Sequence, residues 1–267
     1  MNRASLVRDS IGWDVTNWSR CLSFWEEHSR VAAATPSVLE IGFGGTHGGL
    51  SLWLATKGFQ VVCSGLQEPS PAARRLHAAY GIGDAVTYER IDVLNMPYVA
   101  AFDIVAFKSL LPGMTTGGDR WPVPQRKAIA NMYRALKPGG ELWFAENAAG
   151  TRIHGFFRTH FGWGRKGCGY LSATEAVGLL SAFGTVDYTT LGILGGFGRS
   201  ERQRRALGAV DRALCERVTP QSWRYIITGV ARRNDHGNGA EHAGDERSEK
   251  EPPEEIGAPD TACHPAS

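Results

Sequence analysis

The chain has 267 residues, 42% of them hydrophobic, which is enough for one large α/β domain but hardly for two. No apolar stretch approaches the roughly 18 residues of a membrane span, and the first residues are polar, so we expect neither a span nor a secretory leader and place the protein in the cytoplasm. The five cysteines stand far apart without a C-x-x-C pair, so neither a metal site nor a disulfide framework is predicted.

The net charge of +2 conceals a difference between the body of the chain and its tail. Residues 234–267 hold nine Asp or Glu against two Lys or Arg, which leaves the body at about +9. The tail has no aromatic residue and is rich in Gly, Pro and Glu, so we expect it to be a disordered acidic segment. A basic body suits an anionic acceptor or membrane surface, although scattered solvated charge is the simpler interpretation.

Residues 1–35 precede the first predicted strand and are rich in tryptophan. The segment 13–18 (WDVTNW) leads into a helix-like stretch that carries Leu22, Phe24 and Trp25. We predict an N-terminal helical lid or leader over residues 1–35. It either folds over a cofactor cleft or packs on the sheet, and the aromatic pattern leaves both options open.

Seven apolar, β-branched runs alternate with helical patterns over residues 36–233, which we predict to be one domain. Helices between strands indicate parallel βαβ units. Ser70 followed by Pro71 predicts a helix start, residues 125–137 predict a helix stopped by the Pro-Gly-Gly that follows, and residues 200–203 (SERQ) have the form of a capping box. The predicted strands are residues 37–42, 59–64, 84–91, 102–107, 140–146, 183–192 and 223–231.

The first of these strands runs into a glycine-rich turn, residues 38–46 (VLEIGFGGT). Glycines allow positive φ and let a ligand approach the backbone, so a cofactor is expected on this turn. The carboxylate of Glu40 would repel a pyrophosphate and attract a cation or an amine. A dinucleotide fold favours G-x-G-x-x-G, whereas this turn reads G-x-G-G-x-x-G.

With these residues the sequence resembles the class I S-adenosylmethionine-dependent methyltransferases. Three more segments fit that family: residues 90–93 (RIDV), 102–107 (FDIVAF) and 136–142 (LKPGGEL). The resemblance covers roughly residues 12–232. It implies a Rossmann-like, doubly wound and mostly parallel seven-stranded sheet with an antiparallel strand 7, and S-adenosyl-L-methionine as the cofactor.

The resemblance also implies a set of cofactor contacts around the turn and the neighbouring strand ends. One departure concerns strand 2, where many members place an acid for the ribose hydroxyls and this chain has Gly65, so that Gln67 or Glu68 would have to take over. Loss of a charged hydrogen bond weakens binding by roughly tenfold to a hundredfold. The implied contacts are Glu40, Gly42, Phe43, Gly44, Gly45, Gly65, Leu66, Gln67, Asp92, Val93 and Lys108.

No catalytic triad is visible, and the weak catalytic candidates are Lys108, Glu146, His154 and His160. Lys108 and Glu146 follow strands 4 and 5, where a cation could anchor an anionic acceptor and a carboxylate could take a proton. The two histidines lie in the basic, aromatic segment 151–166, a candidate acceptor pocket whose rings could stack on a ligand or enter a lipid surface. Solvated cations and structural histidines are the alternatives.

The residues at the end of strand 4 limit the class of methyl acceptor that we expect. Residues 107–112 (FKSLLP) lack the Asp/Asn-Pro-Pro-aromatic motif of nucleic-acid amino-methyltransferases, so a nucleic acid is not expected. A small molecule, a glycan or a lipid-linked acceptor remains. We expect the acceptor to carry an anionic group, and peripheral contact of the protein with a membrane is compatible with the sequence. Two rivals stay open: a non-catalytic binding module for an anionic partner and an NAD(P)-dependent oxidoreductase. The oligomeric state is left open.

Overall fold

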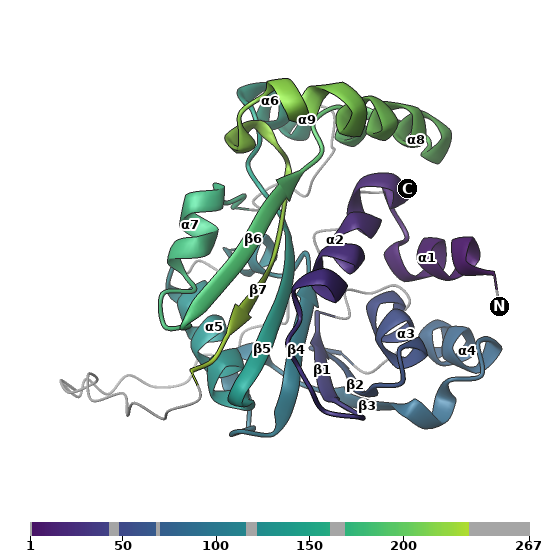
Figure 1. Cartoon of the computed structure of the whole chain (residues 1–267), viewed down its shortest axis with the longest axis vertical. Helices are drawn as coiled ribbons and strands as arrows, with labels where there is room; N and C mark the ends of the chain where they lie inside the picture. Colours follow the sequence, from purple (N-terminus) through teal and green to yellow (C-terminus); the bar gives the residue numbers. More distant parts are fainter. Residues whose placement is uncertain (1, 43–47, 68–69, 116–121, 161–168, 235–267) are drawn as a thin grey trace, which may run out of the picture.

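Seven strands form one twisted sheet in the order β3-β2-β1-β4-β5-β7-β6 (Figure 1). The structure is a computed structural model that describes residues 2–42, 48–67, 70–115, 122–160 and 169–234. The predicted tail, apart from residue 234, lies outside this part of the chain. The strands are β1 (Ser37–Ile41), β2 (Gln60–Gly65), β3 (Val86–Arg90), β4 (Phe102–Lys108), β5 (Leu136–Asn147), β6 (Thr185–Leu191) and β7 (Ile226–Arg232).

The direction of the strands confirms the predicted fold class. β1 pairs in parallel with β2 and β4, and β3 and β5 continue the parallel sheet on either side. β7 runs antiparallel to both β5 and β6. The central strands β1, β4 and β5 are buried almost throughout because helices cover both faces of the sheet.

The sheet separates two core layers, each covered by helices. On one face α2, α3 and α4 pack on the sheet around stacked tryptophans, with the ring centroids of Trp25 and Trp143 separated by 5.8 Å. On the other face α5 and α7 cover Leu39, Val105 and Leu142. The longer helices are α1 (Arg3–Ile11), α2 (Val15–His28), α3 (Gly49–Thr56), α4 (Pro71–Ala79), α5 (Val123–Ala135), α6 (Arg152–His160), α7 (Ala173–Gly178) and α8 (Glu201–Val210), and α8 continues through a π-helical turn (Asp211–Cys215) into α9 (Glu216–Val218).

Several local details differ from the predictions. β5 begins at Leu136 rather than at residue 140, and β7 begins at Ile226 rather than at residue 223. α1 lies within the predicted helical segment 1–35, although no bounds were predicted for it; Asn2 caps it by accepting a hydrogen bond from the Ala4 amide at 2.9 Å. α5 ends at Ala135, two residues early, because Leu136 already pairs with Phe102 across the sheet. The predicted box at Ser200 is not reciprocal: Ser200 caps the amide of Gln203, but the Gln203 side chain accepts from the Arg199 amide.

None of the helices in these ranges has the length and apolar character that crossing a bilayer requires.

Candidate functional site

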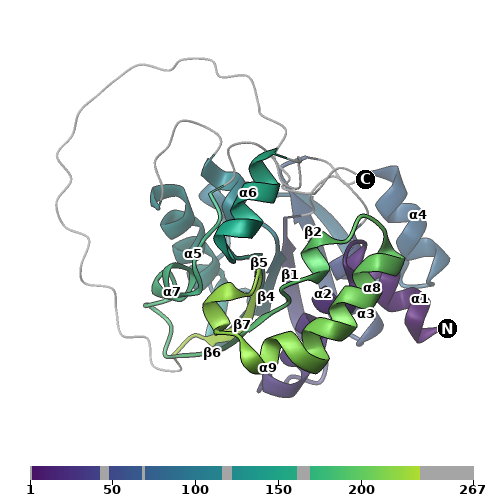
Figure 2. The same ribbon diagram turned by 90° about the horizontal axis from the view of Figure 1, so that it is seen from above.

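The described residues among the predicted cofactor contacts lie on or just after the strands that end at the carboxyl edge of the parallel sheet, which Figure 2 shows from above. The strand order reverses at β1, because the chain adds β2 and β3 on one side of β1 and β4 and β5 on the other. Ile41 at its end stands level with Ser64 on β2 and Phe107 on β4. Open α/β sheets bind ligands outside the carboxyl ends of the strands, at the point where the strand order reverses. The site is therefore expected above β1.

Gly42 opens the turn after β1. Its φ is +97°, a value that L side chains rarely adopt, so glycine is needed where the chain leaves the strand. An added Cβ would also lie 3.4 Å from Cδ1 of Leu110. Phe43, Gly44 and Gly45 lie outside the described residues, and their cofactor contacts stay predictions.

A histidine that sequence analysis missed holds the far end of the turn. The Nε2–H group of His77 donates to the Gly48 carbonyl at 2.8 Å, and the Tyr88 hydroxyl donates to Nδ1 at 2.7 Å. The ring is fully buried, and burial lowers the pKa of His77, which favours the neutral imidazole. A Cβ on Gly48, whose φ is +61°, would lie 2.7 Å from the His77 ring. No sequence motif links these positions.

Glu40 lies beneath the turn rather than at the surface. Its carboxylate accepts from the Ser51 hydroxyl at 3.0 Å and lies 3.6 Å from the Cys63 sulfur. Burial raises the pKa of Glu40 to about 7, and these two hydrogen bonds only partly oppose the shift. A cation bound above the turn would favour the ionised form.

The ends of β2 and β3 carry the predicted adenosine contacts. β2 ends at Gly65, and the exposed residues Leu66 and Gln67 follow it; Glu68 lies outside the described ranges. Asp92 is half-buried at the end of β3, and its carboxylate accepts from the Leu94 amide at 2.8 Å. Both segments thus lie at the carboxyl edge of the sheet, as predicted for adenosine contacts, while their binding roles stay predictions.

Asp92 also fixes the turn after β3, because its second carboxylate oxygen accepts from the Asn95 amide group at 2.8 Å. Val93, the next predicted contact, is buried in the core on the α5 side. The hydrogen bonds on both oxygens of Asp92 orient the carboxylate before any ligand arrives.

Lys108 ends β4 and points into the N-terminal segment. Its Nζ donates to the Ile11 carbonyl at 3.2 Å and lies 4.9 Å from the centre of the Trp18 ring. Loss of hydration lowers the pKa of the ammonium, although nearby carboxylates oppose the shift. The N-terminal helices therefore reach the centre of the carboxyl edge.

Glu146, near the end of β5, is fully buried. Its Oε1 accepts from the amides of Leu110 and Leu111 at 2.6 and 2.7 Å, which ties β5 to the loop after β4. Its Oε2 is buried, and none of the described residues donates a hydrogen bond to it. Burial raises the pKa of Glu146 to about 7. A buried oxygen without a partner is costly, so this atom is a ready acceptor for a ligand donor.

Charge is unevenly distributed around these groups. Asp14, Glu40 and Glu146 all carry pKa values raised to about 7, mainly by burial, and all three interact electrostatically with Lys108. Burial opposes ionisation of these three carboxyl groups, and a cation bound at this edge would favour their ionised forms. The edge of the sheet is suited to a ligand with cationic groups.

The two histidine candidates hydrogen-bond to groups outside this cluster, although the ring of His154 lies 5.6 Å, centre to centre, from the ring of Tyr225. His154 is buried; its Nδ1 accepts from the Thr151 amide at 3.0 Å, and its Nε2–H donates to the Ile193 carbonyl at 2.8 Å. His160, at the end of α6, stacks on Phe156 with ring centroids 4.3 Å apart. These contacts favour structural roles for both rings. Residues 161–166 of the predicted acceptor pocket lie outside the described residues.

A buried polar network that the sequence did not reveal joins the N-terminal segment to the sheet. The Tyr225 hydroxyl, just before β7, donates to Asp14 and accepts from the Asn17 amide group at 2.9 Å. Asn17 also donates to Asp211 at 3.2 Å, and Asp211 in turn accepts from the Gly195 amide at 2.8 Å. In the sequence Asp14 and Asn17 stand three residues apart within residues 13–18, but no pattern connects them with Tyr225 or Asp211.

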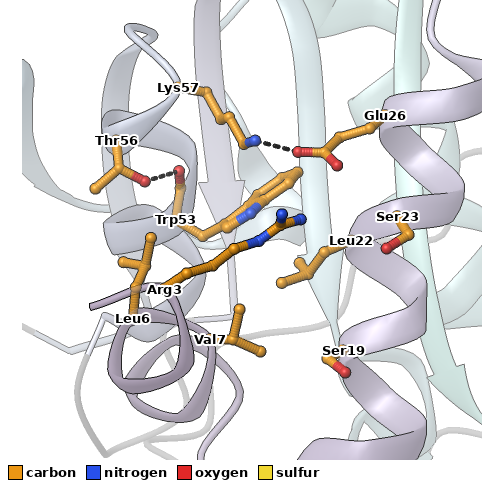
Figure 3. Close-up of a pocket in the computed structure, with 10 residues that line it drawn as sticks. All are labelled: Arg3, Leu6, Val7, Ser19, Leu22, Ser23, Glu26, Trp53, Thr56 and Lys57. Atoms are coloured by element: carbon orange, nitrogen blue, oxygen red, sulfur yellow. Dashed lines mark hydrogen bonds and ion pairs between the residues drawn. The ribbon is translucent and has the colours of Figure 1, made fainter. Parts of the chain in front are cut away.

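A separate pocket of about 510 Å³ opens between α1, α2 and α3 (Figure 3). Trp53 forms its wall, and an ion pair between Lys57 and Glu26 stands at its rim. Among the described residues, none of the predicted site residues lines this pocket, so it is distinct from the edge at β1.

Known protein families and structures share the sequence pattern and the fold of this chain. The sequence model of a family described as "Methyltransferase domain" matches residues 39–144, which run from β1 into β5. No curated protein matches the sequence significantly.

Solved structures share the fold at low sequence identity. A SAM-dependent methyltransferase from Methanosarcina mazei is 16% identical, with 76% of this chain and 95% of that one covered at a TM-score of 0.51. Phosphoethanolamine N-methyltransferase 2 of Haemonchus contortus, bound to phosphomonomethylethanolamine and S-adenosylhomocysteine, is 15% identical, with 81% and 53% covered at 0.54. The [4+2]-cyclase SpnF is 18% identical, with 86% and 93% covered at 0.55. At such identities the likeness establishes the fold alone.

Proposed function

We propose that this chain, with its methyltransferase domain on the class I fold of the S-adenosylmethionine-dependent methyltransferases, moves a methyl group to a small-molecule, sugar or lipid-linked acceptor. The observation that carries the proposal is the turn after β1. Gly42 leaves the central strand with positive φ, at the reversal of strand order and inside the matched segment.

The residues at the edge fit the proposed cofactor. S-adenosylmethionine supplies a methyl group on a positively charged sulfonium together with an ammonium group. The surplus of carboxyl groups over Lys108 suits those charges, and the unpartnered Oε2 of Glu146 offers an acceptor for a donor. The turn from Gly42 to Gly48 would carry the amino-acid end, with Gln67 and Asp92 toward the adenosine.

The acceptor step needs little acid or base assistance because the cofactor already has a good leaving group. Transfer by in-line displacement depends mainly on proximity and alignment. Glu146 is the group at this edge that can hold an acceptor proton, and Lys108 the group that can pair with an acceptor anion. The phosphorylated amine bound to the Haemonchus relative supports an anionic small-molecule acceptor.

We also propose that residues 1–35 act as a cover for this site. The contact of Lys108 with the Ile11 carbonyl and the network around Tyr225 hold α1 and α2 against the carboxyl edge. Substrate entry would then require these helices to move or an opening beside them.

Binding of S-adenosylmethionine tests the cofactor, and calorimetric titration of the full chain is the measurement. We expect micromolar affinity for the native protein and no detectable binding for Gly42→Val, because Val would force the turn out of its positive φ. Gly81→Val is the matched control: Gly81 also has a positive φ, +70°, but a Cβ there meets nothing within 4 Å. Melting temperatures of both variants report whether they fold.

The titration also separates the rival functions. Binding of NAD(P) in place of S-adenosylmethionine would establish the oxidoreductase. Binding of neither would contradict the proposal and favour a non-catalytic module, with Gly65 as the mark of lost cofactor affinity. Unchanged affinity in a folded Gly42→Val protein would refute the role of the turn.

Replacing His77 by Phe is expected to weaken S-adenosylmethionine binding by about tenfold, because the Gly48 carbonyl loses its buried donor. Phe keeps the ring volume, so the change isolates the hydrogen bonds. Tyr88→Phe should give a smaller loss, since the His77 bond to Gly48 survives. Calorimetry checks both variants, and equal affinities in the native and His77→Phe proteins would show that the turn is held by other contacts.

A further inference from the structure

Apolar side chains are unusually exposed at one end of the molecule. Of the ten large hydrophobic residues exposed in the described part of the chain, six belong to α6, to the α8–α9 helix or to the turn before β7. They are Ile153, Phe156, Val210, Leu214, Val218 and Trp223. We name this set the apolar rim.

The helix formed by α8, the π-helical turn and α9 is amphipathic. Val210, Leu214 and Val218 follow one another at four-residue intervals and are 42%, 58% and 70% exposed. This spacing keeps successive side chains on one side of a helix. The opposite side of α8 packs on α2, where Gly208 lies against Thr16. The apolar stripe thus faces away from the protein core.

The same helix also carries exposed arginines. Arg202, Arg205, Arg212 and Arg217 are all exposed, and no ion pair within the described residues engages them. The nearby acids are largely occupied: Glu216 pairs with Arg20, Asp211 is buried, and Glu201 pairs with Arg204. The surface therefore combines exposed apolar side chains with uncompensated positive charge.

The arrangement of these elements suits a flat partner. In Figure 1 α6, α8 and α9 lie together at the upper end of the molecule, above the carboxyl edge of the sheet. Figure 2, seen from that end, shows them around the strand ends rather than on one flank. A planar surface can touch helices at the same level simultaneously, whereas a narrow ligand would engage only one of them.

We propose that this end of the protein docks on a membrane containing anionic lipids. Arginines are attracted to the negative surface potential of such a membrane, and the aliphatic side chains and Trp223 enter its interfacial layer. Exposed arginines and exposed aliphatic side chains on one helix favour this partner over a nucleic acid, which would gain little from contact with Leu214 and Val218. The proposal goes beyond methyl transfer and does not depend on it.

Vesicle co-sedimentation of the full chain tests the docking without cofactor or acceptor. We expect binding to vesicles of phosphatidylcholine mixed with phosphatidylglycerol, and much weaker binding to phosphatidylcholine alone. Leu214→Ser with Val218→Ser, and separately Arg202→Gln with Arg205→Gln, should each weaken vesicle binding by about tenfold or more. Only the arginine pair should also reduce the salt dependence.

Matched controls change equally exposed residues elsewhere. Val99→Ser removes a valine that is 67% exposed just before β4, at the opposite edge of the sheet. Arg75→Gln with Arg126→Gln alters the net charge as much as the test pair does, from α4 and α5. Both controls should bind vesicles like the native chain, and melting temperatures verify that all variants fold.

Several results would overturn the proposal. These are no vesicle binding by the native chain, equal binding with and without phosphatidylglycerol, or native-like binding by both test variants. Tight binding to polyuridylic acid that depends on the arginines but not on Leu214 and Val218 would instead assign a nucleic-acid partner. Loss of S-adenosylmethionine binding with vesicle binding intact would remove the proposed function and leave this inference standing.

Discussion

Replacing Tyr225 by Phe is expected to lower the melting temperature by roughly 5–10 °C. The hydroxyl donates to Asp14 and accepts from Asn17, and all three side chains are almost fully buried. Phe fills the same volume but leaves a buried carboxyl and a buried amide with one partner fewer. Each unsatisfied group costs about 1–3 kcal/mol of unfolding free energy.

The loss should grow with pH. Burial raises the pKa of Asp14 to about 7, while the hydrogen bond from Tyr225 opposes that shift. Above this pKa the Asp14 carboxylate is ionised and depends most on its donor, so the difference between native and Tyr225→Phe proteins is expected to be larger near pH 8 than near pH 6.

Tyr188→Phe is the control, because Tyr188 on β6 is 42% exposed and its loss of a hydroxyl should leave stability nearly unchanged. Scanning calorimetry of the three proteins makes the comparison. If Tyr225→Phe has the same melting temperature as the native protein, the network does not secure α2 to the sheet.

Replacing Glu146 by Gln is expected to flatten the dependence of stability on pH. The folded protein binds the Glu146 proton more tightly than the unfolded chain does, because burial raises the pKa from 4.5 to about 7. The stability contributed by the protonated group is complete below about pH 4.5 and is lost as pH rises toward 7. The shift corresponds to about 3 kcal/mol of unfolding free energy above pH 7.

Gln suits the site because its oxygen can still accept from the amides of Leu110 and Leu111. The variant cannot ionise, so it avoids the cost of a buried charge at high pH. Near pH 5 we expect the unfolding free energy of the variant to be at or below that of the native protein. Between pH 5 and pH 8 it should fall less than that of the native protein does. Asp14 and Glu40 keep a residual slope, since their pKa values are raised in the same direction.

Urea unfolding at a series of pH values measures this effect. Glu27→Gln is the control, since Glu27 is exposed on α2 and should leave the pH profile unchanged. Parallel profiles for Glu146→Gln and the native chain would mean that the Glu146 carboxyl stays ionised in the fold.

The fold could be predicted from local patterns because each strand and most helices carry their own signal. The run from Val38 to Gly42 is apolar and then glycine-rich, which is what a buried strand entering a tight turn needs. Ser70 and Pro71 likewise start α4 through backbone hydrogen bonding and a fixed φ. α5 ended early because pairing of Leu136 with Phe102 overrides helical propensity.

The sequence by itself determined the succession of strands and helices along the chain, the glycine turn after β1 and the positions of Glu40, Asp92, Lys108 and Glu146 at or near strand ends, because these follow from local periodicity and composition. Only the tertiary structure decided which groups meet across long separations. Tyr225 reaches Asp14 over 211 positions, and His77 reaches Gly48 over 29. Such contacts have no local signal, because they depend on how whole elements pack and which polar groups that packing leaves without water.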